Sequence, residues 1–371
     1  MNPLHAFRRS ARALVSEPQR SNYHYRVIDL MRGLAAIAVL LWHYQNFWQS
    51  SSNGPLENAV LLKQPLANIL WPFYTMGYYA VQLFWTISGF VFSAVYGNNI
   101  RSTASFIIAR FARLYPLHFI TLIVVTLLEF ISIGLTGTTQ VFGNFDKYHF
   151  VLNLMMVPYF PGGYSFNGPV WSIIVELVIY VAFWLSHRYL FRFGVIGPAL
   201  ASVLFGAAMA AGIESKIISC GFYFFSGCTL YVLHRSFPDY LIGLLTVIIA
   251  VIGVLIIRSH ESHAMKLFIF AAVLFSSTIE HFIAPRIVGL NWIGDATYSL
   301  YLWHVPVQII VLLAFAGQPW LMSIPFLIAF VGGMMIVARI SFVTLERPLR
   351  DAVSRRLGPT RAPIRISVVG D

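Results

Sequence analysis

Long apolar stretches, each of about 20 residues, follow one another along most of the chain. A helix needs about 20 consecutive apolar residues to cross the hydrocarbon core of a bilayer. The pattern predicts about ten transmembrane helices, over residues 27–48, 75–97, 114–135, 168–187, 189–212, 216–234, 239–257, 265–283, 296–315 and 321–343. A shorter apolar segment at 148–160 is predicted to be interfacial or re-entrant. We therefore expect an all-α polytopic membrane protein.

Composition supports this class, because 58% of the 371 residues are hydrophobic and only 11% are charged. Such a balance excludes a water-soluble domain. We expect a basic tail at 1–25, a transmembrane domain at 26–350 and a second basic tail at 351–371. The first tail lacks the apolar core of a signal peptide. Cys220 and Cys228 fall in one predicted span, too far apart to bridge each other, and are interpreted as packing residues.

The placement of lysine and arginine predicts the orientation. With an even number of spans, both termini lie on one side, and eighteen of the 25 basic residues lie there. Five lie on the other side, and Arg32 and Arg339 lie within spans. The positive-inside rule then predicts that both termini are cytoplasmic, in a multi-pass protein of the cell (inner) membrane. The formal charge of +11 is explained by topology and lipid contact, and no nucleic-acid partner is expected.

Several common catalytic motifs are absent from the sequence, including a Walker loop, a GxGxxG turn, an HExxH helix and paired CxxC motifs. Nucleotide hydrolysis, dinucleotide redox chemistry and the common zinc sites are therefore disfavoured, and no metal is expected. The candidate chemistry comes from scattered ionisable groups within the spans. These are Asp29, Arg32, His43, Glu176 and His304.

Arg32 and His43 lie eleven residues apart in the first span. At about 100° per residue they share one helix face, separated by roughly 16 Å. Ionisable groups at membrane depth are costly and usually functional. The alternative is that Arg32 extends to the headgroups and that His43 is a neutral, hydrogen-bonded histidine of the helix bundle.

Depth along the spans suggests which groups meet. His43 and Glu176 lie roughly 8 Å and 12 Å from the outer ends of their spans, so they are predicted to form a base and its orienting carboxylate. Glu129 and Glu280 lie near span ends and are expected to be solvated or interfacial.

Arg110 and Arg113 form an RxxR pair just before the third span. On a helix they share a face and suit bidentate binding of phosphate. The alternative is that the pair only anchors the helix at the cytoplasmic surface.

Together these residues resemble the membrane acyltransferase family 3, over about residues 24–350. The resemblance is carried by the segments IDLMRGLAAIAVLLWH, FWTISGFVFS, RFARLYPLHF, NGPVWSIIVELVIY, DATYSLYLWHVPV and TLERP. The family pattern has an arginine ten intervening residues before a histidine, an RxxR pair and a WSxxxE run. They are matched by Arg32 and His43, by Arg110 and Arg113, and by Trp171, Ser172 and Glu176. Two segments depart from the family: Glu176 lacks the adjacent second acidic residue, and Phe84-Trp85-Thr86 varies the lead into SGF.

The resemblance implies transfer of an acyl group, most often acetyl, from cytoplasmic acyl-CoA to a hydroxyl of an extracytoplasmic glycan or glycolipid, such as lipopolysaccharide or exopolysaccharide. The expected partners are acyl-CoA, the acceptor and membrane lipids. Arg110, Arg113 and Arg32 are expected to bind the donor. His43 is expected to act as general base, oriented by Glu176, or as a covalent acyl carrier.

Three further residues, Trp171, Ser172 and His304, are assigned to the acceptor site or the cavity wall. An interfacial anchor explains Trp171 equally well, and a tyrosine-rich helix that includes Tyr298 and Tyr301 is the alternative for His304. Competing functions are a secondary transporter or flippase, or an inactive homologue that acts as an assembly partner.

Overall fold

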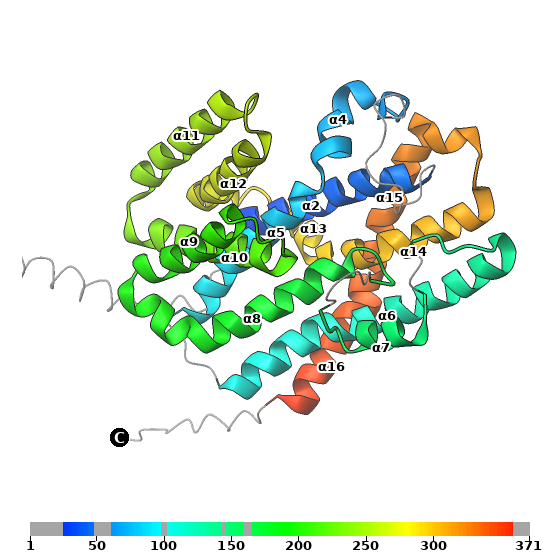
Figure 1. The fold of residues 1–371 in the computed structure, drawn as a ribbon, viewed down its shortest axis with the longest axis horizontal. Coiled ribbons are helices and arrows are strands. Elements are labelled where there is room, and N and C mark those ends of the chain that lie inside the picture. Colours follow the sequence, from blue (N-terminus) through cyan, green and yellow to red (C-terminus); the bar gives the residue numbers. More distant parts are fainter. Residues whose placement is uncertain (1–24, 48–60, 98–101, 142–144, 159–164, 359–371) are drawn as a thin grey trace, which may run out of the picture.

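A computed structural model describes residues 25–47, 61–97, 102–141, 145–158 and 165–358 (Figure 1). The described part is built from helices and contains no strand. Nine of its helical segments are long and apolar enough to cross a membrane. They are α2 (Arg26–Trp42) with the 3-10 turn η1 (His43–Phe47), α5 (Tyr79–Tyr96), α6 (Thr103–Thr136), α8 (Val170–Leu190) with η3 (Phe191–Phe193), α10 (Lys216–Ser236), α11 (Asp239–Ile256), α12 (Glu261–Ile283), α14 (Thr297–Phe315), and α15 (Ile324–Ser341) continued through the π-helix η6 (Phe342–Glu346) into α16 (Arg347–Leu357). The predicted all-α polytopic class is confirmed.

The one predicted span outside these nine segments, 189–212, corresponds to a shorter helix. Here α9 (Ile196–Ala210) has 15 residues and rises about 22 Å, less than the roughly 30 Å hydrocarbon core. Gly194 has φ 59° and separates α9 from η3, so the apolar stretch is not one continuous helix.

Other short helices connect the spans. They are α4 (Ala67–Met76), α7 (Lys147–Leu154), η4 (Val288–Leu290), α13 (Asn291–Asp295) and η5 (Pro319–Met322). The eight-residue α7 lies in the segment predicted to be interfacial or re-entrant and is too short to span.

Two helices extend beyond their predicted limits. The 34 residues of α6 begin at Thr103, so the RxxR pair lies inside this helix. At 1.5 Å per residue α6 is about 51 Å long, more than the roughly 30 Å thickness of a hydrocarbon core. Likewise α16 continues to Leu357, past the predicted domain limit at residue 350. Residues 1–24 and 359–371, which hold most of the two predicted tails, lie outside the described residues.

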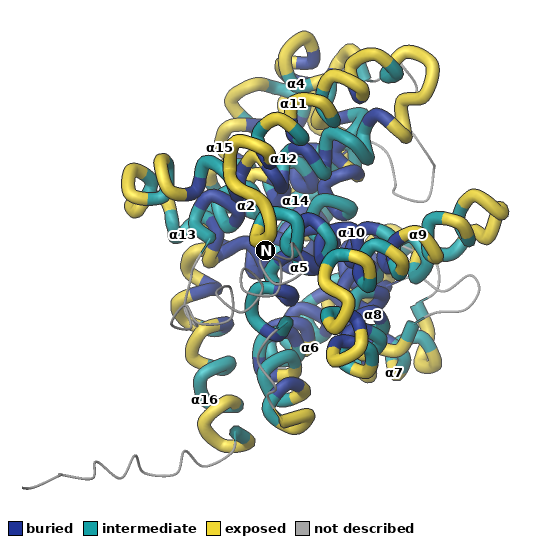
Figure 2. Tube along the Cα trace, turned by 90° about the vertical axis from the view of Figure 1, so that its left-hand side faces the viewer, coloured by how far each residue is buried: buried dark blue, intermediate teal, exposed yellow. Residues whose placement is uncertain are grey.

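The centre of the bundle is formed by α2, α5, α10 and α14, which carry long buried stretches (Figure 2). Helix α11, in contrast, buries only Ile242, Thr246 and Gly253. Most of its other large apolar side chains are exposed, as expected for a surface that faces lipid, whereas Leu245 and Ile249 are half-buried.

Helices α5 and α10 approach each other closely at two glycines. A Cβ atom on Gly89 would lie 1.8 Å from the carbonyl oxygen of Phe224, and one on Gly227 would lie 1.9 Å from that of Thr86. Small residues allow such close helix contacts in membrane proteins. This contact positions the face of α5 that borders the site described below.

Two glutamates that were expected to be solvated are instead buried. Glu129 is 2% exposed and accepts hydrogen bonds from the backbone amides of Gln140 (2.8 Å) and Val141 (3.0 Å). Glu280 is 1% exposed and accepts from the amides of Arg26 (2.7 Å) and Val27 (3.0 Å), at the start of α2. The expectation was wrong because backbone amides, rather than water, satisfy these carboxylates.

Candidate functional site

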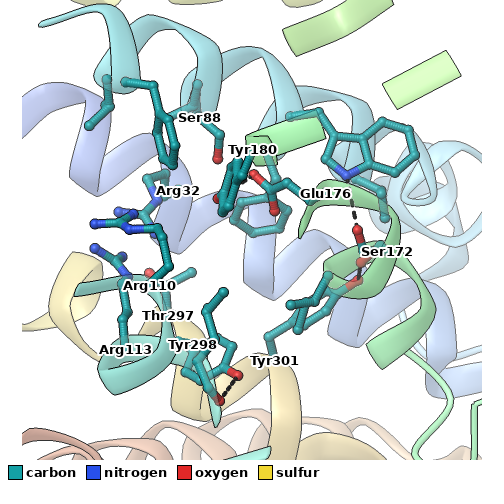
Figure 3. Close-up of a pocket in the computed structure, with 18 residues that line it drawn as sticks. Arg32, Ser88, Arg110, Arg113, Ser172, Glu176, Tyr180, Thr297, Tyr298 and Tyr301 are labelled. Atoms are coloured by element: carbon teal, nitrogen blue, oxygen red, sulfur yellow. Dashed lines mark hydrogen bonds between the residues drawn. The ribbon is translucent and has the colours of Figure 1, made fainter. Parts of the chain in front are cut away.

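A cavity of about 100 Å³ lies among α2, α5, α6, α8 and α14 (Figure 3). We call it the arginine cavity. Its charged lining residues are Arg32, Arg110, Arg113 and Glu176. Its polar and aromatic lining residues include Phe84, Trp85, Ser88, Phe92, Ser172, Tyr180, Thr297, Tyr298 and Tyr301.

The three arginines gather on one side of this cavity (Figure 3). Arg110 and Arg113 lie one turn apart on α6, and Arg32 reaches the same region from α2. Arg32 forms an ion pair with Asp29, 3.3 Å between Nη1 and Oδ1. Arg110 donates to the Tyr96 hydroxyl (3.4 Å), and its guanidinium carbon lies 5.0 Å from the centroid of the Phe92 ring. Three guanidinium groups against one lining carboxylate form a site suited to a polyanion.

Glu176 points into the arginine cavity. Its carboxylate accepts a hydrogen bond from the Tyr180 hydroxyl (2.8 Å), one turn further along α8. Ser88 of α5 lines the same cavity. The sequence analysis did not identify Ser88 or Tyr180. Two features of the sequence could have identified them. Ser88 lies within the FWTISGF segment, and Tyr180 follows Glu176 by four residues, which places both on one helix face.

A second cavity, of about 70 Å³, contains His43. We call it the histidine cavity. Its polar and aromatic lining comes from His43, Asn46, Gln140, Trp171 and Gln308. It shares Asn46, Gln140 and Leu312 with a wider cavity of about 480 Å³, which also has Thr138, Thr139 and Gln318 in its lining.

His43 is the first residue of η1, where α2 changes into a 3-10 turn. Its Nδ1 lies 2.9 Å from the carbonyl oxygen of Val39. A neutral imidazole that donates from Nδ1 has Nε2 as its proton acceptor. The backbone oxygen of His43 accepts a hydrogen bond from the Gln308 side chain (2.8 Å), which connects η1 to α14.

Three helices border both cavities. On α2 and its continuation η1, Arg32 lines the arginine cavity and His43 lines the histidine cavity. On α8 the boundary falls between Trp171, in the histidine cavity, and Ser172, in the arginine cavity. On α14 it falls between Tyr301 and Val305. The two cavities therefore lie on opposite sides of one wall of side chains.

The structure does not bring Glu176 to His43. Their side chains line different cavities, and the carboxylate pairs with Tyr180 instead. Five residues at about 100° each turn Glu176 about 140° away from Trp171, which shares the cavity of His43. The residue beside His43 is His304, with ring centroids 4.9 Å apart. His304 is 1% exposed and lies in the wall between the cavities.

No group of three or more His, Cys, Asp or Glu side chains in the described ranges is arranged to hold a metal ion. The arginine cavity has the charge to bind a polyanion, and the imidazole of His43 has a nitrogen that is able to accept a proton. This arrangement suits transfer of a group from a phosphate-bearing donor to a second molecule bound near His43.

Comparisons with known proteins agree with this chemistry. The model of a family described as acyltransferase domain matches residues 25–340. The chain is similar to protein 2 in picA locus of Rhizobium radiobacter, with 26% identity over 182 residues, 44% of this chain and 81% of that protein. It is also similar to acyltransferase MdmB of Streptomyces mycarofaciens, with 28% identity over 160 residues, 43% of this chain and 38% of that protein. No solved structure matches. Because the family match covers well over half of its length, this chain belongs to the membrane acyltransferase family 3.

Proposed function

We propose that this protein transfers an acyl group, in the first place acetyl, from acyl-CoA to a hydroxyl of an extracytoplasmic glycan or glycolipid. The observation that carries the proposal is the pair of cavities on opposite sides of one wall, one rich in arginine and the other holding a histidine base. We place the protein in the cell membrane with both termini cytoplasmic, so that the arginine cavity opens toward the cytoplasm.

The arginine cavity is the proposed donor site. CoA carries several phosphate charges, which Arg110 and Arg113 are suited to bind through forked hydrogen bonds. A cavity of about 100 Å³ is small compared with the roughly 300–1,000 Å³ of a whole-ligand pocket. We therefore expect the nucleotide part of CoA to remain at the entrance of the arginine cavity, with the arm that carries the thioester inserted past Arg32.

The histidine cavity is the proposed acceptor site. Asn46, Gln140 and Gln308 offer both donors and acceptors to sugar hydroxyls. Trp171 supplies an aromatic surface in the same cavity. The wider cavity beside it gives room for the rest of a glycan.

For the reaction we propose direct transfer. Nε2 of His43 removes the proton from the acceptor hydroxyl, whose oxygen attacks the thioester carbonyl. Glu176 is now assigned to the donor site, where it balances the arginine charges and holds Tyr180. The alternative is covalent, with His43 taking the acyl group before the acceptor receives it.

The test uses the protein in lipid nanodiscs with labelled acetyl-CoA and a panel of octyl glycosides of glucose, galactose, mannose and N-acetylglucosamine. We expect wild type to label at least one glycoside and His43→Gln to transfer about 10² to 10⁴ times more slowly. A histidine in a similar setting but outside both cavities, His187, serves as the control, and His187→Gln is expected to retain transfer. If wild type labels no glycoside, the proposed function is wrong. Label on a His43 peptide, formed without acceptor at the turnover rate, would replace direct transfer by the covalent scheme.

A further inference from the structure

His304 lies at the boundary between the two cavities. On α14, Thr297, Tyr298 and Tyr301 line the arginine cavity, whereas Val305 and Gln308 line the histidine cavity. His304 falls between these two groups.

The imidazole of His304 is nearly inaccessible, and one of its nitrogens has no partner. Its ring centroid lies 4.9 Å from that of His43 and 6.0 Å from that of Tyr301. Nε2 has no hydrogen-bond partner among the described residues. A buried polar atom without a partner is energetically costly, so it calls for a reason.

We propose that His304 is a second catalytic residue, which relays the proton from His43 to the departing CoA thiolate. The inference rests on the proposed function. In the reaction the acceptor O–H bond breaks, the O–C bond to the acyl group forms and the C–S bond breaks. The proton passes from the hydroxyl to His43, then to His304, and ends on the sulfur as the free thiol.

The position of the reacting atoms explains why a relay is needed. During transfer the acceptor oxygen and the donor sulfur are bonded to the same carbonyl carbon, so this carbon has to lie at the boundary of the two cavities, with the oxygen on the side of His43 and the sulfur on the side of the arginine cavity. An imidazolium and a thiolate left at this buried boundary would both be poorly solvated, which is costly. An imidazole has one donor and one acceptor nitrogen, so His304 can receive a proton at one site and release one at the other.

A packing role for His304 is the competing explanation, and the chain offers a matched control. His187 on α8 is 4% exposed, donates from one ring nitrogen to the Trp184 carbonyl and also has an unpartnered Nε2. It lines neither cavity. The change to glutamine at His187 therefore reports the effect of altering a buried histidine without a role in the relay.

The experiment compares acetyl-CoA with acetyl-selenocoenzyme A in single-turnover transfer to the octyl glycosides. A selenolate is a much weaker base than a thiolate and departs without needing a proton. With acetyl-CoA, we expect His304→Gln to be slower than wild type by about 10²-fold, the lower end of general acid–base effects. With the selenium donor the deficit should shrink to within about threefold. His43→Gln should keep its full deficit with both donors, because the acceptor proton must still be removed.

The outcomes separate the relay from other roles. An equal His304→Gln deficit with both donors overturns the relay and assigns His304 to positioning His43. A deficit no larger than that of His187→Gln removes His304 from the reaction. If wild type transfers from neither donor, the proposed function itself is wrong, which is a result distinct from the other two.

Discussion

The hydroxyl groups of Ser172 and Tyr301 lie 2.8 Å apart at the boundary of the two cavities, although 129 residues separate them in the chain. Both also contact the carbonyl oxygen of Pro169, Ser172 at 3.1 Å and Tyr301 at 3.3 Å. The start of α8 and the first half of α14 are thus joined by two short polar contacts, from the Tyr301 hydroxyl to the Ser172 hydroxyl and to the Pro169 carbonyl. These contacts close the wall that the acyl group has to cross.

Tyr301→Phe is expected to weaken this wall, because it removes the hydroxyl but keeps the ring. The lost hydrogen bond is worth about 0.5–1.5 kcal/mol. We predict that water gains access to the thioester, so that acetyl-CoA is hydrolysed faster without acceptor. Release of the free CoA thiol measures this hydrolysis. Tyr298→Phe is the control, because the Tyr298 hydroxyl donates to the Leu114 carbonyl elsewhere on the same cavity. Equal rates of hydrolysis in the two variants would contradict the role of the Ser172–Tyr301 contact.

Arg110→Ala and Arg113→Ala are each expected to weaken CoA binding by about 1.5–3 kcal/mol per lost charged hydrogen bond. Lysine at either position should restore only part of the affinity, since it lacks the planar fork of arginine. Titration calorimetry with CoA and 3'-dephospho-CoA measures both effects. Arg192→Ala changes an exposed arginine of η3 and should leave affinity intact. Unchanged binding in both cavity variants would assign the RxxR pair to topology alone.

Glu129→Gln is expected to raise the KM for the glycoside about tenfold with little change in CoA affinity. The carboxylate holds the backbone at Gln140 and Val141, which form one wall of the histidine cavity. An amide accepts only on its oxygen, so one of the two backbone bonds is lost, at about 1–3 kcal/mol. Glu280→Gln makes the same change where a carboxylate holds the start of α2. The two variants should lose similar stability, but a selective rise in acceptor KM is predicted only for Glu129→Gln.

Gly227→Ala is expected to destabilise the bundle by about 1–3 kcal/mol, the usual cost of overpacking. The new methyl group would lie 1.9 Å from the carbonyl oxygen of Thr86, so α10 would have to move away from α5. Gly243→Ala on α11 is the matched control, because a Cβ there meets nothing within 4 Å. Thermal unfolding in detergent should show a lower midpoint for the first variant only. Similar midpoints would mean that the α5–α10 contact adjusts without cost.

Much of the architecture was predictable from the sequence because crossing a bilayer imposes a local rule. Each span needs about 20 apolar residues, and this rule identified the helices without knowledge of their partners. It failed where local information was incomplete. Gly194 shortened the helix expected at 189–212. Helix α6 begins eleven residues before its predicted span, because a segment that carries two arginines can be helical without lying in lipid.

The sequence by itself determined the class of protein, the family and the chemical groups available, including Arg32, His43, Arg110, Arg113 and Glu176. Tertiary structure decided which of them meet. Depth along a helix does not say which face a side chain occupies, so the predicted pairing of Glu176 with His43 was replaced by contacts of Glu176 with Tyr180 and of His43 with His304. The burial of Glu129 and Glu280 was also decided at this level, because backbone amides outside their own helices satisfy their carboxylates. Such contacts join residues up to 254 positions apart, and no local pattern of hydrophobicity or charge records them.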